Sequence, residues 1–370
     1  MEEDPFSGSG LRPVELADRP VLDACFKSLA QPLSDYTFSQ LYTWRNSLRI
    51  LWKMIRGHLC VFANGTGDLT LLTPPIGDGG GDAALAEAFD LMDDYNARHG
   101  VLERSRVEYV SDELLDRFDR SRLCVRPMSG DYVYESARMI DLPGGELASK
   151  RQAKNRFIRN YNYYVENYRG DAHRDACLAL LDRWKVRRDT QDPRESDASA
   201  VKRSKESAAT ALCLDTAEQL GLKGMVVYVN EGGGFSLRGF TFGEHLGTDQ
   251  SSITIEKTDL AVKGLSQFIF SEFCRLHWSD RPFVNVGDDW GLPSLAWTKQ
   301  SYRPARLLSK YTMGIVRPVV SGPTVFAPAP LFQAHPVTAH GRHRAPMIGK
   351  RPKSYKPPCP SLRSPRLSTS

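Results

Sequence analysis

The chain has 370 residues, of which 41% are hydrophobic and 25% are charged, so a soluble globular protein with one large domain or two smaller ones is expected. No segment approaches the roughly 20 consecutive apolar residues of a membrane-spanning helix, and the acidic start MEEDPFSGSG lacks the apolar core of a signal peptide. The seven cysteines are scattered without a CxxC pair, which predicts reduced thiols in a cytoplasmic chain and no zinc site.

The formal net charge of +5 is unevenly distributed along the chain. Residues 317–370 contain nine Lys and Arg and neither Asp nor Glu, which leaves 40 basic and 44 acidic residues in 1–316, a net charge of −4. Such a body is poorly suited to non-specific binding of duplex DNA, so any anion site must be local. The segment 317–370 also holds 11 of the 23 prolines and is predicted to be a disordered basic tail, as residues 1–10 are predicted to be a disordered N-terminus.

Residues 11–140 have the pattern of an N-terminal domain that mixes strands and helices. A helix is expected in SDYTFSQLYTWRN (34–46), with Ser34 and Asp35 as candidate N-caps. The other expected elements are strands at 11–14, 48–55, 58–64, 69–74 and 105–110 and helices at 21–30 and 83–99.

Residues 141–316 repeat this pattern and are predicted to form a C-terminal domain. The glycine-rich segment 231–234 predicts a hairpin turn between two strands. The expected elements are helices at 147–168, 172–188, 204–220, 260–278 and 292–302 and strands at 225–229, 236–246, 251–257 and 282–287.

The turn AVKGLS (261–266) leads from a strand into a helix, where the free N–H groups of the first turn favour anions. Gly264 would let a ligand approach the backbone, and Lys263 adds positive charge. GNAT acyltransferases bind a cofactor pyrophosphate at this position, but the Gln or Arg that opens their pattern is replaced here by Ala261. A glycine in a tight turn explains the segment equally well.

Asp288 and Asp289 follow the end of a predicted strand, where sites in α/β proteins usually lie. The two carboxylates could bind an ammonium group or cap the next helix. In that helix Leu295, Lys299 and Tyr302 share one face, so Lys299 either belongs to a site or extends its ammonium group to solvent.

The helix expected from residue 147 begins with a cluster of basic side chains and has no acidic residue before Glu166. Lys150 and Lys154 lie on one side of it. Positive charge at a helix start is unfavourable by a few tenths of a kcal/mol, roughly, for each side chain, which predicts an anionic partner. The histidines are dispersed and show no metal-binding spacing.

The order and spacing of five segments resemble the C-terminal domain family of phosphatidylglycerol lysyltransferase, through nearly all of 11–315. These segments are SDYTFSQLYTWR (34–45), 130–161, LGLKGMVVYVN (220–230), 253–273 and 285–312. The resemblance implies an α/β (α+β) fold of two tandem GNAT-like acyltransferase domains, with mixed sheets flanked by helices. It also implies transfer of an aminoacyl group from aminoacyl-tRNA to a lipid or another small hydroxyl or amine acceptor.

Two sets of site residues follow from the resemblance. In the catalytic set, Lys299 would stabilise developing negative charge, and Asp288, Asp289 or Glu256 would bind the donor ammonium or act as base. The set that would bind the donor is Lys150, Lys154, Asn155, Arg156, Lys257, Lys263, Gly264, Ser266, Tyr302 and Arg303.

The implied partners are the acceptor end of a charged tRNA and a lipid or small-molecule acceptor, with no bound cofactor and no metal. Two other functions stay open: an acyl-CoA-dependent N-acyltransferase and a non-catalytic RNA- or lipid-binding protein. Peripheral contact with a membrane, the transferred group and the oligomeric state are also left open.

Overall fold

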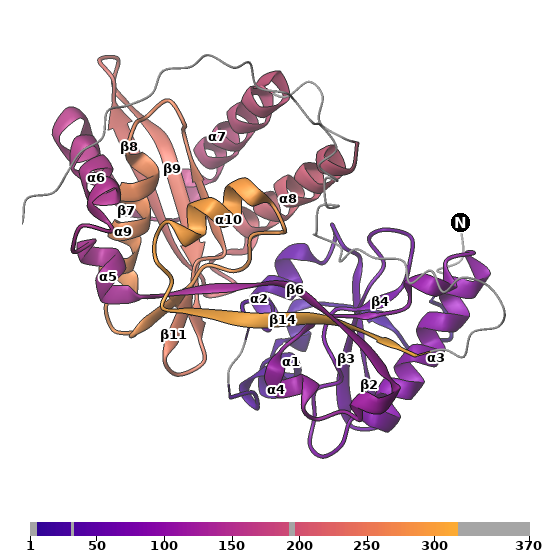
Figure 1. Ribbon diagram of the computed structural model, residues 1–370. Coiled ribbons are helices and arrows are strands. Elements are labelled where there is room, and N and C mark those ends of the chain that lie inside the picture. The colour runs from indigo at the N-terminus through magenta and orange to yellow at the C-terminus, as the bar shows by residue number, and fades with distance from the viewer. Residues whose placement is uncertain (1–5, 31–32, 192–196, 317–370) are drawn as a thin grey trace, which may run out of the picture. The chain divides into compact units, whose positions relative to one another are not determined.

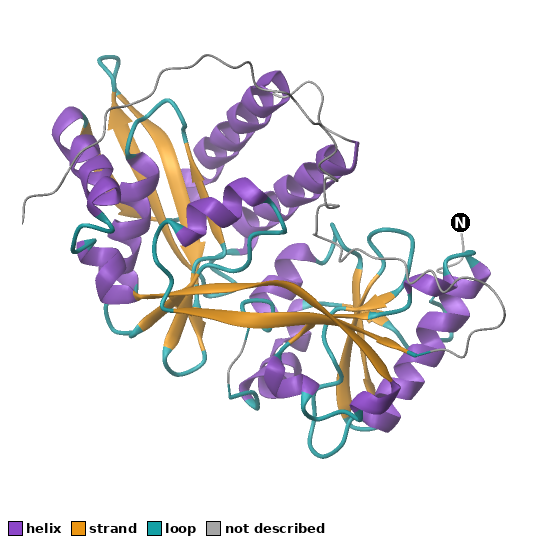
Figure 2. Ribbon diagram, in the orientation of Figure 1, coloured by secondary structure: helices purple, strands orange, loops and turns teal. Residues whose placement is uncertain are grey.

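The computed structural model describes residues 6–30, 33–191 and 197–316, and Figure 2 distinguishes its helices from its strands. The strands in these ranges form a ten-stranded and a four-stranded sheet. The larger sheet has the order β1 (Arg12–Pro13), β2 (Ile50–Ile55), β3 (His58–Ala63), β4 (Thr70–Leu71), β5 (Val107–Val110), β14 (Arg306–Ile315), β6 (Leu123–Glu135), β13 (Phe283–Asn285), β11 (Gln250–Ser252) and β10 (His245–Leu246). The smaller has the order β12 (Ile255–Thr258), β9 (Phe235–Gly243), β8 (Lys223–Asn230) and β7 (Asn162–Asn167). The predicted tail, 317–370, lies outside the described residues.

The α-helices of the described residues pack around these sheets and enclose apolar cores. They are α1 (Arg19–Lys27), α2 (Phe38–Trp44), α3 (Asp82–Arg98), α4 (Asp112–Leu115), α5 (Ser136–Asp141), α6 (Ala148–Asn160), α7 (Gly170–Gln191), α8 (Asp197–Thr216), α9 (Leu265–His277) and α10 (Pro293–Gln300). The strands predicted at 48–55, 58–64 and 69–74 are present as β2, β3 and β4, and β3 pairs antiparallel with both of the others. The predicted hairpin of β8 and β9 is confirmed.

Two long strands, β6 and β14, which run side by side (Figure 1), were not predicted from the sequence pattern. They are antiparallel, with Arg306 opposite Val133 and Ile315 opposite Leu123. β6 contains Pro127 and a glycine, which interrupt a strand pattern, and β14 alternates only weakly. Since β14 also pairs with β5, a strand from the segment 141–316 completes the sheet of the segment 11–140.

The prediction that the basic helix continues to residue 168 is wrong, because α6 ends at Asn160 and β7 follows directly. The sequence Asn-Tyr-Tyr-Val, rich in aromatic and β-branched residues, favours a strand there. Residues 251–257, predicted as one strand, divide between the two sheets as β11 and β12. The backbone changes partner between them, since the N–H of Ile253 donates to Asn285 and that of Thr254 donates to Phe242.

The prediction of a disordered N-terminus is wrong for the part of residues 1–10 that the structure describes. Phe6 is only 4% exposed and stacks on Tyr95 with 5.1 Å between ring centroids. A single aromatic residue in a polar segment carries no periodic signal, so the pattern could not reveal this contact.

Gly264 is the N-cap of α9 and is required by close packing against α6. Its φ is 86°, and a Cβ placed there would lie 2.1 Å from the carbonyl oxygen of Ala153. Gly264→Ala is therefore expected to lower the free energy of unfolding by about 2–5 kcal/mol, through left-handed backbone strain and overpacking. Urea denaturation would measure this. Gly145→Ala is the matched control, because no atom lies within 4 Å of its Cβ position; equal unfolding of the two variants would contradict the expectation.

Candidate functional site

A cavity of about 660 Å³ brings together segments that are far apart in the sequence. It is lined by residues from the segment before α2 and from α2 itself, from α8, β12 and α9, and from the loop 286–292 that leads into α10. Six of the predicted site residues lie in its wall: Glu256, Lys257, Ser266, Asp288, Lys299 and Tyr302. The other eight do not line it: Asp289, Lys150, Lys154, Asn155, Arg156, Lys263, Gly264 and Arg303.

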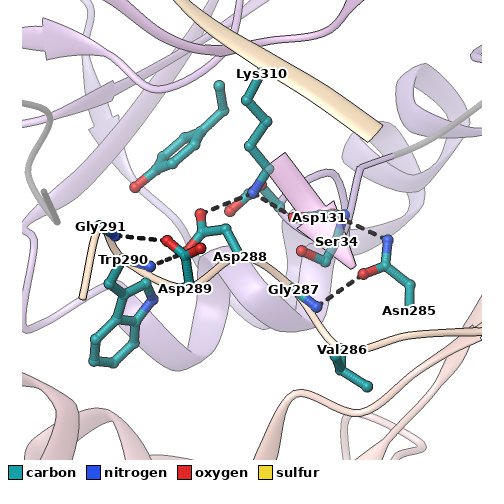
Figure 3. Close-up of polar contacts among 12 residues, drawn as sticks. Ser34, Asp131, Asn285, Val286, Gly287, Asp288, Asp289, Trp290, Gly291 and Lys310 are labelled. Atoms are coloured by element: carbon teal, nitrogen blue, oxygen red, sulfur yellow. Dashed lines mark hydrogen bonds and ion pairs between the residues drawn. The ribbon is translucent and has the colours of Figure 1, made fainter. Parts of the chain in front are cut away.

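A buried ion cluster lies on one side of this cavity (Figure 3). The ammonium group of Lys310, which is 1% exposed, lies 2.6 Å from Asp131 and 3.1 Å from Asp288 and also pairs with Asp35. Asp131 is fully buried and accepts hydrogen bonds from the backbone N–H of Ser34 at 2.7 Å and the amide of Asn285 at 3.0 Å. Lys310 thus forms ion pairs with three carboxylates that come from three separate segments of the chain.

The protonation of this cluster follows from its burial and its single cation. Burial raises the pKa of Asp35 to about 7, although Lys310 opposes the shift. Burial would also raise the pKa of Asp131, but Lys310 and the hydrogen bonds from Ser34 and Asn285 bring it below its ordinary value. Burial would lower the pKa of Lys310, yet the surrounding carboxylates raise it well above its ordinary range, so Lys310 stays charged.

Asp35 and its neighbour were predicted as caps of α2, and this prediction is wrong. The N-cap is Thr37, whose side-chain oxygen accepts the N–H of Gln40 at 3.1 Å. Ser34 and Asp35 instead lie in the cavity wall. A polar residue before a helix favours a cap when only local pattern is considered, whereas its partners here are distant in the sequence.

Lys299 holds the loop before α10 rather than presenting a free ammonium group. Its Nζ donates to the carbonyl oxygens of Val286 at 2.7 Å and Gly287 at 3.1 Å, and also to that of Asp288. An ammonium group has three N–H donors, so these three contacts use all of them. Burial lowers the pKa of Lys299 to about 8, although nearby acids, Asp288 first, oppose the shift.

Asp289 braces the same loop instead of capping α10, whose N-cap is Leu292. It is 7% exposed and accepts hydrogen bonds from the Tyr132 hydroxyl at 2.7 Å and the Gly291 N–H at 2.9 Å. The adjacent Trp290 adopts a left-handed φ of 54°, a strained conformation for a residue with a large side chain. Lys299 and Asp289 together fix a strained loop in the cavity wall.

Glu256 differs from the other carboxylates in the wall because it forms no ion pair within the part of the chain that the structure describes. No hydrogen bond or ion pair among the described residues involves its carboxylate, and burial raises its pKa to about 8. The adjacent Lys257 turns instead to Glu206 and to the ring of Trp184, whose centroid is 4.5 Å away. Glu256 is therefore the titratable group in this wall that is most available to a ligand.

The basic helix α6 has a mixture of internal and exposed cations. Lys154 donates to the Ile140 carbonyl at 3.1 Å and the Ser271 hydroxyl at 2.7 Å, which ties α6 to α9. Arg156 and Asn155 are exposed. Lys150 lies over the ring of Tyr302 at 4.5 Å, and burial lowers its pKa. In the predicted basic cluster, Lys154 therefore has a structural role, whereas Lys150 and Arg156 could contact an anion.

Lys310, Asp131 and Asp35 are functional candidates that the sequence analysis did not identify as site residues. The available signal was a single charge inside a strand-like segment, as with Lys310 in LLSKYTM and Asp131 before YVY.

None of the helices in the described ranges combines the length and apolar character needed to cross a bilayer. The same residues contain no group of His, Cys, Asp and Glu suited to a metal ion.

Comparisons with known proteins agree with this architecture. Residues 26–314 match the family described as phosphatidylglycerol lysyltransferase, C-terminal. A conserved protein of unknown function from Bacteroides thetaiotaomicron superposes with a TM-score of 0.70 at 24% identity, over 83% of this chain and 99% of that one. L-PGS from Bacillus licheniformis superposes with a TM-score of 0.53 at 13% identity, over 82% and 93%. These likenesses confirm the predicted fold class, tandem GNAT-like domains with mixed sheets flanked by helices.

A curated relative, an uncharacterized protein from Mycoplasmoides gallisepticum, is 23% identical over 198 residues. The match covers 52% of this chain and 58% of that relative. The chain therefore spans a little more than half the length of the curated relative that it matches.

Proposed function

This chain belongs to the phosphatidylglycerol lysyltransferase C-terminal domain family, and we propose on that premise that it is an aminoacyltransferase. The donor would be an aminoacyl-tRNA, and the acceptor a lipid or another small molecule with a hydroxyl or amine group. The observation that carries this proposal is Glu256, a carboxyl in the wall of a 660 Å³ cavity that forms no ion pair with any described residue, with a pKa raised by burial to about 8, although Lys257 opposes the shift. At neutral pH such a group is mostly protonated and can both donate and accept a proton.

Transfer of an aminoacyl ester needs no covalent enzyme intermediate. The acceptor attacks the ester carbonyl, and the departing ribose oxygen must gain a proton when the ester bond breaks. One oxygen of Glu256 would donate that proton while the other takes the proton that the acceptor loses, so the carboxyl is restored at the end. Tyr302 lies in the same wall, and burial raises its pKa, so its hydroxyl stays protonated and can donate to the developing oxyanion.

The buried ion cluster supplies the rest of the proposed arrangement. Asp35 and Asp288 face the cavity, and Lys310 offsets only part of the charge of the three carboxylates. This side of the wall therefore suits the α-ammonium group of a donor. Lys299 would act as a positioning residue, because its three protons already bind the loop 286–288.

An acyl-CoA donor is the second candidate, and Ala261, which stands where the GNAT pattern has Gln or Arg, argues against it. A Cβ placed at Gly264 would lie 2.1 Å from the carbonyl oxygen of Ala153 in α6, so this position needs a glycine for packing alone. The glycine that resembled part of a cofactor loop therefore has a packing role here. A non-catalytic RNA- or lipid-binding protein would not need a desolvated carboxyl in a cavity, which disfavours the third candidate.

The test is to incubate the purified chain with a lipid extract and either tRNA charged with labelled amino acids or labelled acetyl-CoA. We expect label in the lipid phase only with charged tRNA, and its appearance should be prevented by prior RNase treatment. Label that depends on acetyl-CoA would support the second candidate. No transfer from either donor, together with retained binding of RNA or lipid, would support the third.

A further inference from the structure

Trp297 on α10 is 70% exposed, more than any other large hydrophobic residue of the described chain. Its neighbours on the exposed side of α10 are polar or small, as Ser294, Thr298 and Gln300 show. Leaving an indole in solvent forgoes the free energy that its burial would provide, so an isolated exposed Trp is a candidate contact residue.

Lys150 connects this indole to the cavity. Its Nζ lies 5.8 Å from the centroid of the Trp297 ring and 4.5 Å from that of the Tyr302 ring. Tyr302 is 7% exposed and lines the cavity, and Thr298 and Lys299 of the same helix also line it. Trp297, Lys150 and Tyr302 therefore form a continuous set of contacts from the surface to the cavity wall.

Lys150 is a cation beside Trp297, and the two helices that carry this pair, α6 and α10, contain no acidic residue of their own. Arg156 of α6 is exposed, and so is Arg303, which follows Tyr302 and adopts a left-handed φ of 58°. An aromatic platform with cations beside it is the chemistry that binds the base and phosphates of single-stranded nucleic acid.

A membrane surface is the competing partner, and the pattern around Trp297 fits it less well. An interfacial helix presents a broad apolar face, whereas α10 exposes one indole among polar side chains. Stacking of a nucleobase needs one aromatic face, and a set of contacts into the cavity is useful only if the ligand enters it.

We propose that Trp297 and Lys150 form a stacking platform for the 3′-terminal nucleobase of the donor RNA, with the aminoacyl ester directed into the cavity. This inference rests on the proposed function, since it assigns a place to the nucleoside that carries the ester. Lys150 and Arg303 would supply positive charge for the adjacent phosphates.

The test measures binding of a fluorescein-labelled single-stranded RNA ending in CCA to the full chain by anisotropy. Trp297→Ala is expected to weaken binding roughly 5- to 150-fold, the range for one stacked base, and Trp297→Phe should retain most of it. Phe235→Ala is the matched control, because Phe235 is a 45% exposed aromatic residue of β9 outside the cavity wall. An RNA that lacks only the terminal base should bind the wild type more weakly than the complete RNA does. Trp297→Ala should bind the two RNAs with equal affinity.

The outcomes separate this inference from the proposed function. Trp297→Ala binding the RNA as tightly as the wild type overturns the platform, whether or not transfer from charged tRNA occurs. A variant that binds RNA normally but loses binding to phosphatidylglycerol vesicles also overturns it and assigns Trp297 to a membrane contact. Failure of the wild type both to bind the RNA and to transfer from charged tRNA overturns the proposed function as well.

Discussion

Lys310→Met is expected to lower the free energy of unfolding by about 3–5 kcal/mol, the range for removing one member of a buried ion pair. Methionine approximately preserves the shape of the side chain but leaves Asp35, Asp131 and Asp288 without their shared cation. Urea denaturation at pH 7 would measure the loss. Lys263→Met is the control, because Lys263 is exposed, and a change within about 0.5 kcal/mol is expected there.

The free energy of unfolding that Lys310→Met loses relative to the wild type should become smaller as pH falls. Without Lys310 the folded-state pKa values of Asp35 and Asp131 rise, so the folded variant binds more protons than its unfolded chain above about pH 4. Its free energy of unfolding then rises as pH falls, and its deficit relative to the wild type shrinks. Asp35→Asn added to Lys310→Met should restore part of the stability at pH 7, which keeps the test available if the single variant does not fold. A deficit below about 1 kcal/mol, or one that grows on acidification, would contradict this role for Lys310.

The buried ion cluster is the part of the site that could not be predicted from the sequence pattern. Periodicity predicted most helices and the strands β2 to β4, and a glycine-rich turn predicted the hairpin of β8 and β9, because these features depend on neighbouring residues. Lys310 binds Asp131 across paired strands whose members are far apart in the sequence, and local pattern does not contain that information. β6 and β14, which bring them together, were the strands with the weakest patterns.

The candidate catalytic residues were predicted in part. Glu256, Asp288 and Lys299 were named, and the structure brings all three to one cavity. The hydrogen-bond and ion-pair partners of these residues could not be predicted from the sequence, although these partners determine what each side chain can do. Lys299 was expected to stabilise negative charge, but three backbone carbonyls occupy its protons. Lys154 was expected to bind phosphate, but it ties α6 to α9 through Ser271.

Glu256→Gln is expected to lower kcat/KM for aminoacyl transfer by about 10²–10⁴-fold at pH 7, the usual contribution of a general acid–base group. Glutamine keeps the shape and can donate a hydrogen bond, but it cannot exchange a proton with the acceptor and the departing ribose oxygen. The measurement is transfer from charged tRNA at substrate concentrations below KM. Glu272→Gln is the matched control, because Glu272 lies on α9 outside the cavity wall and pairs with Arg275. A change of about twofold or less in kcat/KM is expected there, about 0.5 kcal/mol or less.

The pH profile identifies the group responsible. Burial raises the pKa of Glu256 to about 8, and the protonated carboxyl is the active form in the proposed transfer. The wild-type kcat/KM should therefore fall as pH rises through about 8, and Glu256→Gln should lose this fall along with most of the rate. Lys299 also has a pKa near 8, lowered by burial, and its deprotonation would release the loop 286–288. If the fall above pH 8 persists in Glu256→Gln, it belongs to Lys299, and the proton transfer assigned to Glu256 is wrong.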